Sequence, residues 1–329
     1  MFTLRRGKLV KLIITIPAYN EENTVSSVLD EIPDQIDGID NIETLLIDDG
    51  STDGTVDMAQ KHGVDYIIYH KTNKGLGVSF RDGIEASLEK GADIIVNIDA
   101  DGQYNAKQIP DLIKPLLEGK ADIVLGWRDI RNLDHMTRSK KLGNRMATWI
   151  IRVLSGFDVK DAQTGYRAFT RDAAMRLNLF GKYTYVQETI IRAYHKGLHI
   201  EQVPVEFRNR PGESRLIRNI WSYAYQAGAT ILSTYRDLYP LRFFFSVGLI
   251  FALAGLGFGI RVLVHFSQTG MVTPRLPSAI LAGFLILFGL GSFSLGIFLQ
   301  MLNTQRRFIE EILYRLKKNG SNGSSIHNP

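Results

Sequence analysis

Ile94-Ile-Val-Asn-Ile-Asp-Ala-Asp-Gly-Gln103 is the stretch of this 329-residue chain on which the fold prediction depends. Its first five residues are apolar apart from one asparagine, which is typical of a strand buried on both faces. Asp99 and Asp101 follow at once, and side chains two residues apart in an extended segment point the same way. The stretch therefore predicts a buried strand that ends in two converging carboxylates.

Short runs rich in β-branched residues recur around this strand and are separated by segments with helical periodicity. The predicted strands are 12–16, 44–47, 66–69, 94–98 and 123–125, and the predicted helices are 22–32, 55–62, 78–90 and 106–117. Apolar strands that alternate with amphipathic helices indicate an α/β sheet of the Rossmann type. Ligands of such sheets bind beyond the carboxyl ends of the strands, so functional residues should follow each strand.

Polar clusters follow four of the five predicted strands. These clusters are Pro17-Ala-Tyr-Asn-Glu21, Asp48-Asp-Gly-Ser-Thr-Asp53, Asp99-Ala-Asp-Gly-Gln103 and Gly126-Trp-Arg128. Packing alone does not account for polar clusters at four strand ends, so we expect a binding site along this edge of the sheet.

The two carboxylates of Asp99 and Asp101 would repel each other unless a cation neutralises them. Oxygen ligands favour Mg²⁺ or Mn²⁺, which commonly link a protein carboxylate to substrate phosphates. Gln103 adds a further oxygen. An Asp-x-Asp sequence is also found in turns and helix caps, but its position after a buried strand favours the metal site.

Asp48 and Asp49 have two interpretations. Asp, Gly, Ser and Thr favour turns and helix starts, so Asp48-Asp-Gly-Ser51 is predicted to be a capped turn. One carboxylate of the pair could at the same time accept hydrogen bonds from a base or ribose. In the cluster after the first strand, Asn20 is expected to cap a helix, which would leave Tyr19 for stacking on a base.

Two apolar segments near the carboxyl terminus, about 243–264 and 279–302, are each long enough to cross a hydrocarbon core. The alternative to two membrane spans is a pair of buried core helices. The connecting loop carries one arginine, whereas the outer flanks carry Arg236, Arg242 and a basic segment from Arg306 to Lys318. The positive-inside rule then places both termini and the catalytic part in the cytoplasm. Gly255 and Gly259 suggest a close approach of the two helices.

Composition excludes several classes of function. The chain has no cysteine, which excludes disulfides, thiolate zinc sites and cysteine nucleophiles. The net charge of +5 is modest, and no RNA-binding or zinc-finger signature is present, so a nucleic-acid partner is not expected. The amino terminus has no apolar stretch of the signal-peptide kind.

These observations predict four parts. They are a catalytic α/β domain over residues 1–210, interfacial amphipathic helices over 211–240, two transmembrane helices over 241–303, and a cytoplasmic amphipathic helix with a disordered tail over 304–329.

The motifs Pro17-Ala-Tyr-Asn-Glu21, Asp48-Asp-Gly-Ser-Thr-Asp53 and Asp99-Ala-Asp-Gly-Gln103 resemble, in order and spacing, those of the family-2 glycosyltransferases with a GT-A fold. Two later motifs, Asp161-Ala-Gln-Thr-Gly-Tyr166 and Gly212-Glu-Ser-Arg-Leu216, are similar to the polyprenyl-phosphate branch. That branch contains the dolichyl-phosphate mannose and glucose synthases and their bacterial undecaprenyl-phosphate relatives. The resemblance covers about residues 10–220.

The resemblance implies roles for individual residues. The nucleotide-sugar would be bound by Pro17, Ala18, Tyr19, Glu21, Asp48, Asp49, Lys74, Gly75, Asp99, Ala100 and Asp101. The metal and diphosphate would be organised by Asp99, Asp101 and Gln103. The acceptor phosphate would be held by Arg128, Arg138, Ser139, Arg210 and Arg215, although the family commonly has lysine where Arg215 stands. Catalysis would then rest on Asp99, Asp101, Arg128 and Arg138.

The implied reaction moves one hexose from a donor of the GDP-mannose or UDP-glucose type to dolichyl or undecaprenyl phosphate, with inversion. A processive polysaccharide synthase is the first alternative, but its Gln-x-x-Arg-Trp motif is not found because the chain has no Arg-Trp pair. A non-catalytic membrane scaffold with the same fold is the second, and both metal-site aspartates argue against it. The resemblance leaves a homo-oligomer open.

Overall fold

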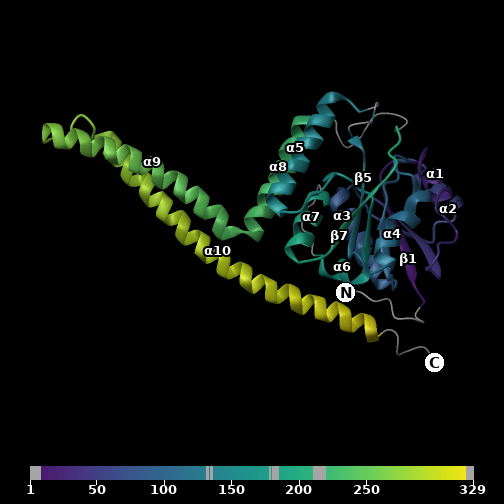
Figure 1. Cartoon of the computed structure of the whole chain (residues 1–329). Helices are drawn as coiled ribbons and strands as arrows, with labels where there is room; N and C mark the ends of the chain where they lie inside the picture. The colour runs from purple at the N-terminus through teal and green to yellow at the C-terminus, as the bar shows by residue number, and fades with distance from the viewer. Residues whose placement is uncertain are drawn as a thin grey trace. The chain divides into compact units, whose positions relative to one another are not determined.

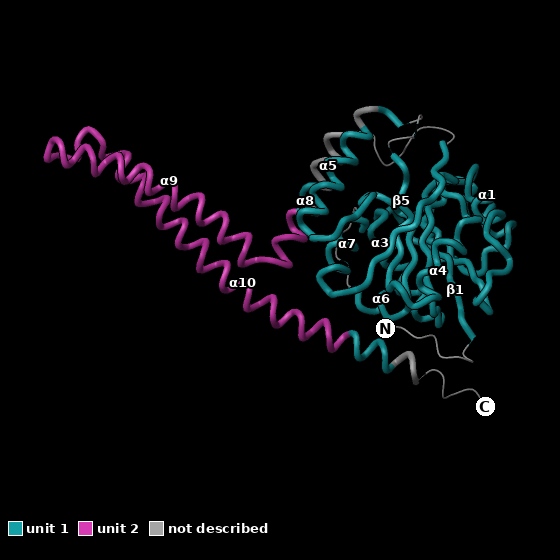
Figure 2. The backbone as a smooth tube through the Cα atoms, viewed as in Figure 1, with its two compact units in different colours: residues 1–231, 314–329 teal, residues 232–313 magenta. Residues whose placement is uncertain are grey.

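The computed structural model describes residues 9–130, 133, 136–177, 179, 185–209 and 220–323. For residues 138, 139, 220–227, 230 and 320–323 it describes the backbone alone. The chain divides into two compact units, Met1–Ile231 with Tyr314–Pro329, and Leu232–Leu313 (Figure 2).

The first unit is built on a seven-stranded sheet with the order β3-β2-β1-β4-β6-β5-β7 (Figure 1). The strands are β1 Lys11–Ala18, β2 Asn41–Asp48, β3 Tyr66–Tyr69, β4 Ile94–Asn97, β5 Ile123–Trp127, β6 Arg167–Thr170 and β7 Ile200–Pro204. Strand β6 runs antiparallel to β4 and β5, while the other pairs are parallel. The predicted α/β architecture and its five strands are confirmed, and β6 and β7 are additions that the sequence pattern did not predict.

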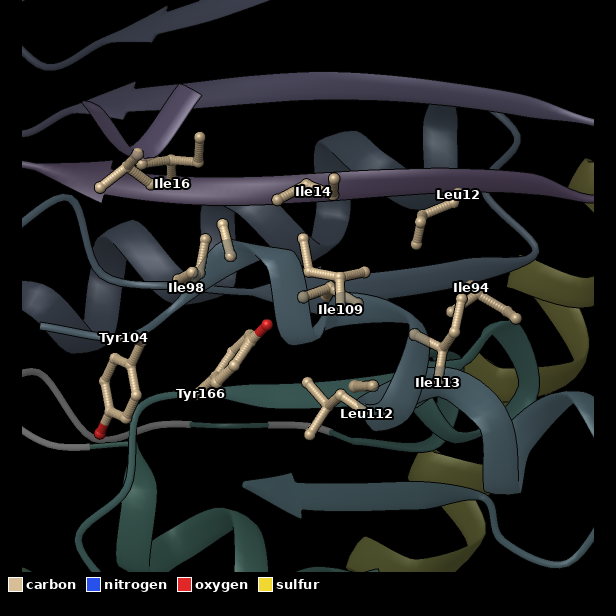
Figure 3. Packing of buried hydrophobic residues seen from close by; sticks show 14 of the residues in the cluster. Leu12, Ile14, Ile16, Ile94, Ile98, Tyr104, Ile109, Leu112, Ile113 and Tyr166 are labelled. Atoms are coloured by element: carbon tan, nitrogen blue, oxygen red, sulfur yellow. The ribbon is translucent and has the colours of Figure 1, made fainter. Parts of the chain in front are cut away.

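Helices cover both faces of the sheet. They are α1 Val25–Asp30, α2 Thr55–Lys61, α3 Leu76–Glu89, the short 3₁₀ helix η1 Ala106–Gln108, α4 Ile109–Leu117, α5 Arg138–Ser155, α6 Arg171–Arg176 and α7 Val186–His195. Leu12, Ile14 and Ile16 alternate along β1 and pack with Ile109 and Leu112 of α4 in the main apolar core (Figure 3). The opposite face carries α3, whose Gly83 lies so close to Ile47 that a Cβ would approach its Cδ1 to 2.9 Å. Burial on both faces explains why the strands read as nearly continuous apolar runs.

Three helices follow the sheet domain: α8 Ile220–Leu238, α9 Pro240–Thr269 and α10 Leu276–Gly323. Helices α9 and α10 both have a mean hydropathy of 2.2 over their most apolar windows, and only 17% and 22% of those windows are buried. A core helix of a soluble protein would be mostly buried, so the interpretation as core helices is wrong. Both helices are long and apolar enough to cross a membrane.

Glycines let the two long helices pack closely within the second unit. A Cβ at Gly248 would approach the carbonyl oxygen of Gly289 to 2.7 Å, and a Cβ at Gly255 would approach Ile286 Cγ1 to 2.8 Å. Gly248 and Gly255 are seven residues apart, the spacing of a coiled-coil seam. A Cβ at Gly259 would meet only Ala282 Cβ, at 4.0 Å. The expected Gly255–Gly259 pair is therefore corrected to a Gly248–Gly255 pair.

Helix α10 continues without interruption to Gly323. The basic segment from Arg306 to Lys318 is thus the last part of the same helix and not a separate one, and residues 320–323 are helical where a disordered tail was expected. The remaining residues of that tail, 324–329, lie outside the described residues.

Candidate active site

The candidate site lies where the strand order changes direction. Strand β1 has β2 on one side and β4 on the other, and the chain reaches β4 only after β2 and β3. Such a switch point leaves a crevice beyond the carboxyl ends of the strands. The loops that follow β1, β2 and β4 all leave the sheet at this edge, and the loop that enters antiparallel β6 arrives there.

The loops after β1 and β2 are locked together by Asn20. Its backbone has a φ of +56°, its Oδ1 accepts a hydrogen bond from the Thr52 amide at 2.7 Å, and its own amide donates to Ser51 Oγ at 2.9 Å. Helix α1 begins only at Val25, after Thr24. The expectation that Asn20 caps a helix is therefore wrong, and its side chain instead holds two predicted nucleotide-binding segments in contact.

Asp48 and Asp49 are both buried and both accept backbone hydrogen bonds. Asp48 Oδ1 accepts from the Ser51 amide at 3.1 Å, which confirms the predicted capped turn. Asp49 accepts from the amides of Lys74 and Gly75, each at 2.9 Å. The structure thus brings Asp49, Lys74 and Gly75 together, but it gives Asp49 the task of shaping the turn before α3. Direct contact of either aspartate with a nucleotide stays a prediction.

The residues after β1 differ in exposure. Pro17 and Ala18 end the strand and are buried, whereas Tyr19 is 39% exposed and so can offer its ring to a base. Glu21 accepts a hydrogen bond from Thr24 Oγ1 at 3.0 Å. The charge of Glu21 also reaches Asp99, since it is one cause of the raised pKa of that carboxyl. This strand end therefore borders the metal motif, as predicted.

Asp99 is a half-buried carboxyl whose Oδ1 is covered by protein. Burial, and next the charge of Asp101, raise its pKa to about 7. Its Oδ1 has no hydrogen-bond partner within the part of the chain that the structure describes. A buried charge at such a place is costly without an opposite charge, and an all-oxygen set of ligands suits a hard divalent cation. The residues present therefore fit the predicted metal.

Asp101 and Gln103 complete the motif after β4. The Gln103 amide donates to Asp101 Oδ1 at 3.1 Å, and the side-chain Nε2 of Gln103 donates to the carbonyl oxygen of Arg208 at 3.3 Å. That second bond directs the amide nitrogen of Gln103 toward the chain after β7, so its Oε1 is the atom predicted to bind the metal. Ala100 between the aspartates is buried.

Two residues next to Asp99 were not predicted. Gly165 faces the carboxylate so closely that a Cβ would lie 2.6 Å from Asp99 Oδ2. Arg167 is fully buried and donates from Nε to the Thr164 carbonyl oxygen at 2.9 Å, and its charge lowers the pKa of Asp99. Its Nη1 and Nη2 make no hydrogen bond with the described residues, and burial lowers the pKa of Arg167 to about 10. Gly165 lies in the motif Asp161-Ala-Gln-Thr-Gly-Tyr166 and Arg167 follows it, but the resemblance gave neither residue a role.

Arg128, which follows β5, is held by a buried carboxylate. Its Nε donates to Asp161 Oδ2 at 2.6 Å and its Nη2 to Asp161 Oδ1 at 3.1 Å, while the guanidinium lies over the ring of Phe207. Burial favours neutral forms of both groups, but their mutual attraction raises the pKa of Arg128 and lowers that of Asp161. Arg128 is thus rigidly placed, and most of its charge is balanced within the chain.

The other predicted acceptor residues are only partly placed. Arg138 and Ser139 form the first turn of α5 after Thr137, whose Oγ1 accepts a hydrogen bond from the Lys140 amide. Arg210 and Arg215 lie outside the described residues. Their roles stay predictions.

Residues 13–177 match the profile of the family described as Glycosyl transferase family 2. The chain is 31% identical over 316 residues to the glycosyltransferase AglJ of Haloferax volcanii, which covers 91% of this chain and 97% of the relative. It is 32% identical to the UDP-N-acetylglucosamine–dolichyl-phosphate N-acetylglucosaminyltransferase of Methanococcus voltae, over 60% of this chain and 85% of the relative.

A similar solved structure is glucosyl-3-phosphoglycerate synthase from Mycobacterium tuberculosis in complex with Mn²⁺, UDP-glucose and phosphoglyceric acid. It has a TM-score of 0.54 and 25% identity, covering 69% of this chain and 80% of that one. The likeness confirms the nucleotide-sugar-binding type of fold for the sheet domain.

Proposed function

Because the chain belongs to glycosyl transferase family 2, we propose that it transfers a single hexose from a nucleotide-sugar to a polyprenyl phosphate. The donor would be of the GDP-mannose or UDP-glucose type, and the acceptor dolichyl or undecaprenyl phosphate. The observation that carries the proposal is the Asp99 carboxylate beside Asp101, whose covered Oδ1 has no hydrogen-bond partner among the described residues, in a chain that also has two apolar helices long enough to span a membrane. The dolichyl-phosphate acceptor of the Methanococcus voltae relative supports the choice of lipid.

Asp99, Asp101 and the Gln103 side-chain oxygen would hold Mg²⁺ or Mn²⁺. When bound, the ion supplies positive charge that stabilises the diphosphate leaving group. The Mn²⁺ in the complex of the Mycobacterium tuberculosis synthase supports this assignment. Gly165 leaves room for the Asp99 carboxylate, and the loops joined by Asn20 shape the nucleotide end.

In the proposed step, an oxygen of the acceptor phosphate forms a bond to the anomeric carbon as the bond from that carbon to the diphosphate breaks. Nucleoside diphosphate leaves with the electron pair, and a single displacement inverts the anomeric centre. A phosphate monoester has a second pKa of about 6, so it is largely dianionic at neutral pH. Its attacking oxygen therefore needs no strong general base. The chain's contribution is to orient the two phosphates and to balance their charge.

Arg128 would orient the acceptor phosphate by donating hydrogen bonds and would add little net charge, because Asp161 already balances it. The remaining positive charge would come from Arg138 with Ser139 at the start of α5 and from Arg210 and Arg215. Guanidinium groups suit this task because they bind phosphate oxygens in pairs.

The sheet domain would meet the lipid surface through α5. Leu142, Met146, Trp149 and Val153 recur at helical spacing and are between 59% and 67% exposed. Lys140, Lys141, Arg145 and Arg152 lie on the same helix. An exposed apolar stripe flanked by cations is typical of helices in the membrane interface, near anionic headgroups. This surface would bring the polar headgroup of a lipid acceptor close to the start of α5.

The cytoplasmic side is the proposed location of the sheet domain and both termini. The segment between α9 and α10 carries one basic residue, Arg275. At the opposite side, α8 carries Arg236, the first turn of α9 carries Arg242, and α10 carries Arg306 and Arg307 beyond its apolar part. This asymmetry follows the positive-inside rule.

The test is transfer of label from GDP-mannose, UDP-glucose and UDP-N-acetylglucosamine to polyprenyl phosphate in membranes that contain the full chain. Label should enter the organic phase with one donor, with Mg²⁺ or Mn²⁺ and not with EDTA. Membranes with Asp101→Asn at equal protein level are the matched control and should give none. Metal-dependent binding of a nucleotide-sugar without lipid-linked label would reject the lipid acceptor, and no metal-dependent binding would favour the scaffold.

A further inference from the structure

A buried histidine links three segments at the nucleotide end of the candidate site. His70 follows β3 directly, and its side chain is 2% exposed. Its Nδ1 lies 2.7 Å from Asp49 Oδ1, at the end of β2, and its Nε2 lies 3.1 Å from Asp82 Oδ2 on α3. No motif in the sequence points to this residue.

The carboxylate of Asp49 is the centre of the arrangement. Besides His70, it accepts hydrogen bonds from the amides of Lys74 and Gly75, so one side chain fixes the turn that leads into α3. Gly75 has φ +93° and ψ 152°, a conformation that glycine adopts without strain. Gly50 lets the chain pass close to the same turn, because a Cβ there would lie 2.9 Å from the Thr72 carbonyl carbon.

Each ring nitrogen of His70 faces one carboxylate, Nδ1 that of Asp49 and Nε2 that of Asp82. Charged neighbours also face Asp82: Lys74 Nζ lies 3.9 Å from its Oδ2 and Arg81 Nε lies 3.6 Å from its Oδ1. Asp82 therefore has other cations near it, while Asp49 is buried and depends on His70 for its only side-chain partner among the described residues.

We propose that His70 is a positioning residue that, through Asp49, holds the turn 73–75 in the shape that binds the nucleotide. The inference rests on the proposed function, since it concerns the donor end of the same site. His70 itself is covered by protein and does not touch the donor; its effect passes through the hydrogen bonds from Asp49 to the Lys74 and Gly75 amides. Loss of the His70–Asp49 bond should loosen the turn and weaken donor binding without changing acceptor use.

Two amide substitutions separate the two hydrogen bonds of the ring. The side-chain nitrogen of Asn is as many bonds from Cβ as Nδ1 of His, and that of Gln is as many as Nε2. His70→Asn therefore keeps a donor for Asp49 and loses the one for Asp82, whereas His70→Gln does the reverse. Both variants remove the ring, and they differ in which carboxylate keeps a donor and by one methylene in length.

The measurement is the Kd of UDP and of GDP, each with Mn²⁺, for the full chain in detergent, using whichever nucleotide the wild type binds more tightly. We expect His70→Gln to raise Kd about tenfold or more, as for loss of a buried hydrogen bond to a charged group, and His70→Asn to stay within about threefold. The donor KM of transfer should follow the Kd, while the acceptor KM and the kcat at saturating donor stay near wild type.

Wild-type affinity in His70→Gln, or an equal loss in both variants, would overturn the positioning role and leave the proposed function standing. A wild type that binds neither nucleotide would reject the proposed function and this inference with it. If His70→Gln does not fold, His70→Ala with added imidazole replaces it. Recovery of nucleotide affinity by imidazole is then expected, and absence of recovery would overturn the proposal.

Discussion

Two regions at the same edge of the sheet each contain a carboxylate, and they differ in whether the chain itself supplies a partner for its oxygens. Around Asp161, the chain supplies its own cation: Arg128 binds both carboxylate oxygens, Asn144 Nδ2 donates to Oδ1 at 3.2 Å, and the pKa of Asp161 is lowered. Around Asp99, Oδ1 has no partner in the described structure, and burial raises the pKa to about 7. Asp161 is fully buried, whereas Asp99 is half-buried with its Oδ1 covered by protein.

The difference distinguishes a carboxylate that belongs to the structural framework from one that belongs to a binding site. A buried carboxylate with its own arginine is complete when the chain folds, and removal of either partner leaves a charge unpaired. A buried carboxylate without a partner raises the free energy of the folded state until a ligand supplies the missing charge. We therefore expect substitutions at Asp161 to affect mainly stability and substitutions at Asp99 to affect mainly function.

The largest expected effect is that of Asp99→Asn on transfer. Loss of a charged metal ligand should lower the rate by about a thousandfold or more, since the ion contributes several kcal/mol at the transition state. The same substitution should stabilise the metal-free protein at pH 8. The folded pKa of about 7 lies above the ordinary value of 3.8, so the ionised Asp99 destabilises the folded state as pH rises through this range.

Transfer assays and thermal unfolding of the detergent-solubilised chain, with and without Mn²⁺, check both parts. Mn²⁺ should raise the thermal midpoint of the wild type and leave that of the variant unchanged. An Asp99→Asn protein that is less stable than metal-free wild type at pH 8 would show that the carboxylate is compensated within the chain.

The second effect is that of Asp161→Asn on stability. Arg128 would lose its charged partner while it stays buried, which should lower the free energy of unfolding by about 3 kcal/mol. Asp158→Asn is the matched control, because Asp158 is 88% exposed in its ion pair with Arg152 and surface pairs contribute little. Thermal unfolding of both variants checks the prediction, and equal midpoints would contradict the framework role of Asp161.

The sequence located the two aspartates more readily than it located the partner of Arg128, for a physical reason. Asp99 and Asp101 follow a short buried strand, a local pattern that the sequence shows directly. The resemblance implied that Arg128 holds the acceptor phosphate, but its ion pair with Asp161 joins residues 33 positions apart. Local periodicity contains no information on such a pair.

The same limit explains the missed strand β6 and the altered role of Asn20. Strand β6 has four residues and inserts antiparallel between β4 and β5, so its neighbours depend on long-range pairing. Asparagine is a common helix-capping residue, but the side chain of Asn20 accepts a hydrogen bond from the amide of Thr52, 32 residues away. The two long apolar helices were predicted well because length and hydropathy, which the sequence shows directly, are enough to identify a candidate membrane span.

A third, smaller effect is expected when the space beside Asp99 is filled. Gly165→Ala would place a Cβ 2.6 Å from Asp99 Oδ2, so the carboxylate must shift from its present position. We expect the Mn²⁺ affinity to fall about tenfold, the size of effect that misplaced metal ligands produce. Gly143→Ala is the control, because a Cβ there meets nothing within 4 Å. Calorimetric titration with Mn²⁺ in the presence of UDP measures both, and unchanged affinity in Gly165→Ala would show that the pair tolerates displacement.

The pH dependence of metal binding distinguishes the two carboxylates directly. Below its pKa of about 7, Asp99 holds a proton that the ion must displace, so Mn²⁺ affinity should fall about tenfold for each pH unit below about 7 and level off above it. Asp161 has a pKa below its ordinary value, so its pair with Arg128 is fully formed throughout this range and contributes no slope. Titration with Mn²⁺ between about pH 5.5 and 8 checks this. A flat profile would mean that Asp99 is already ionised at pH 5.5, so that Arg167 neutralises it as Arg128 neutralises Asp161, and the contrast between the two regions would disappear.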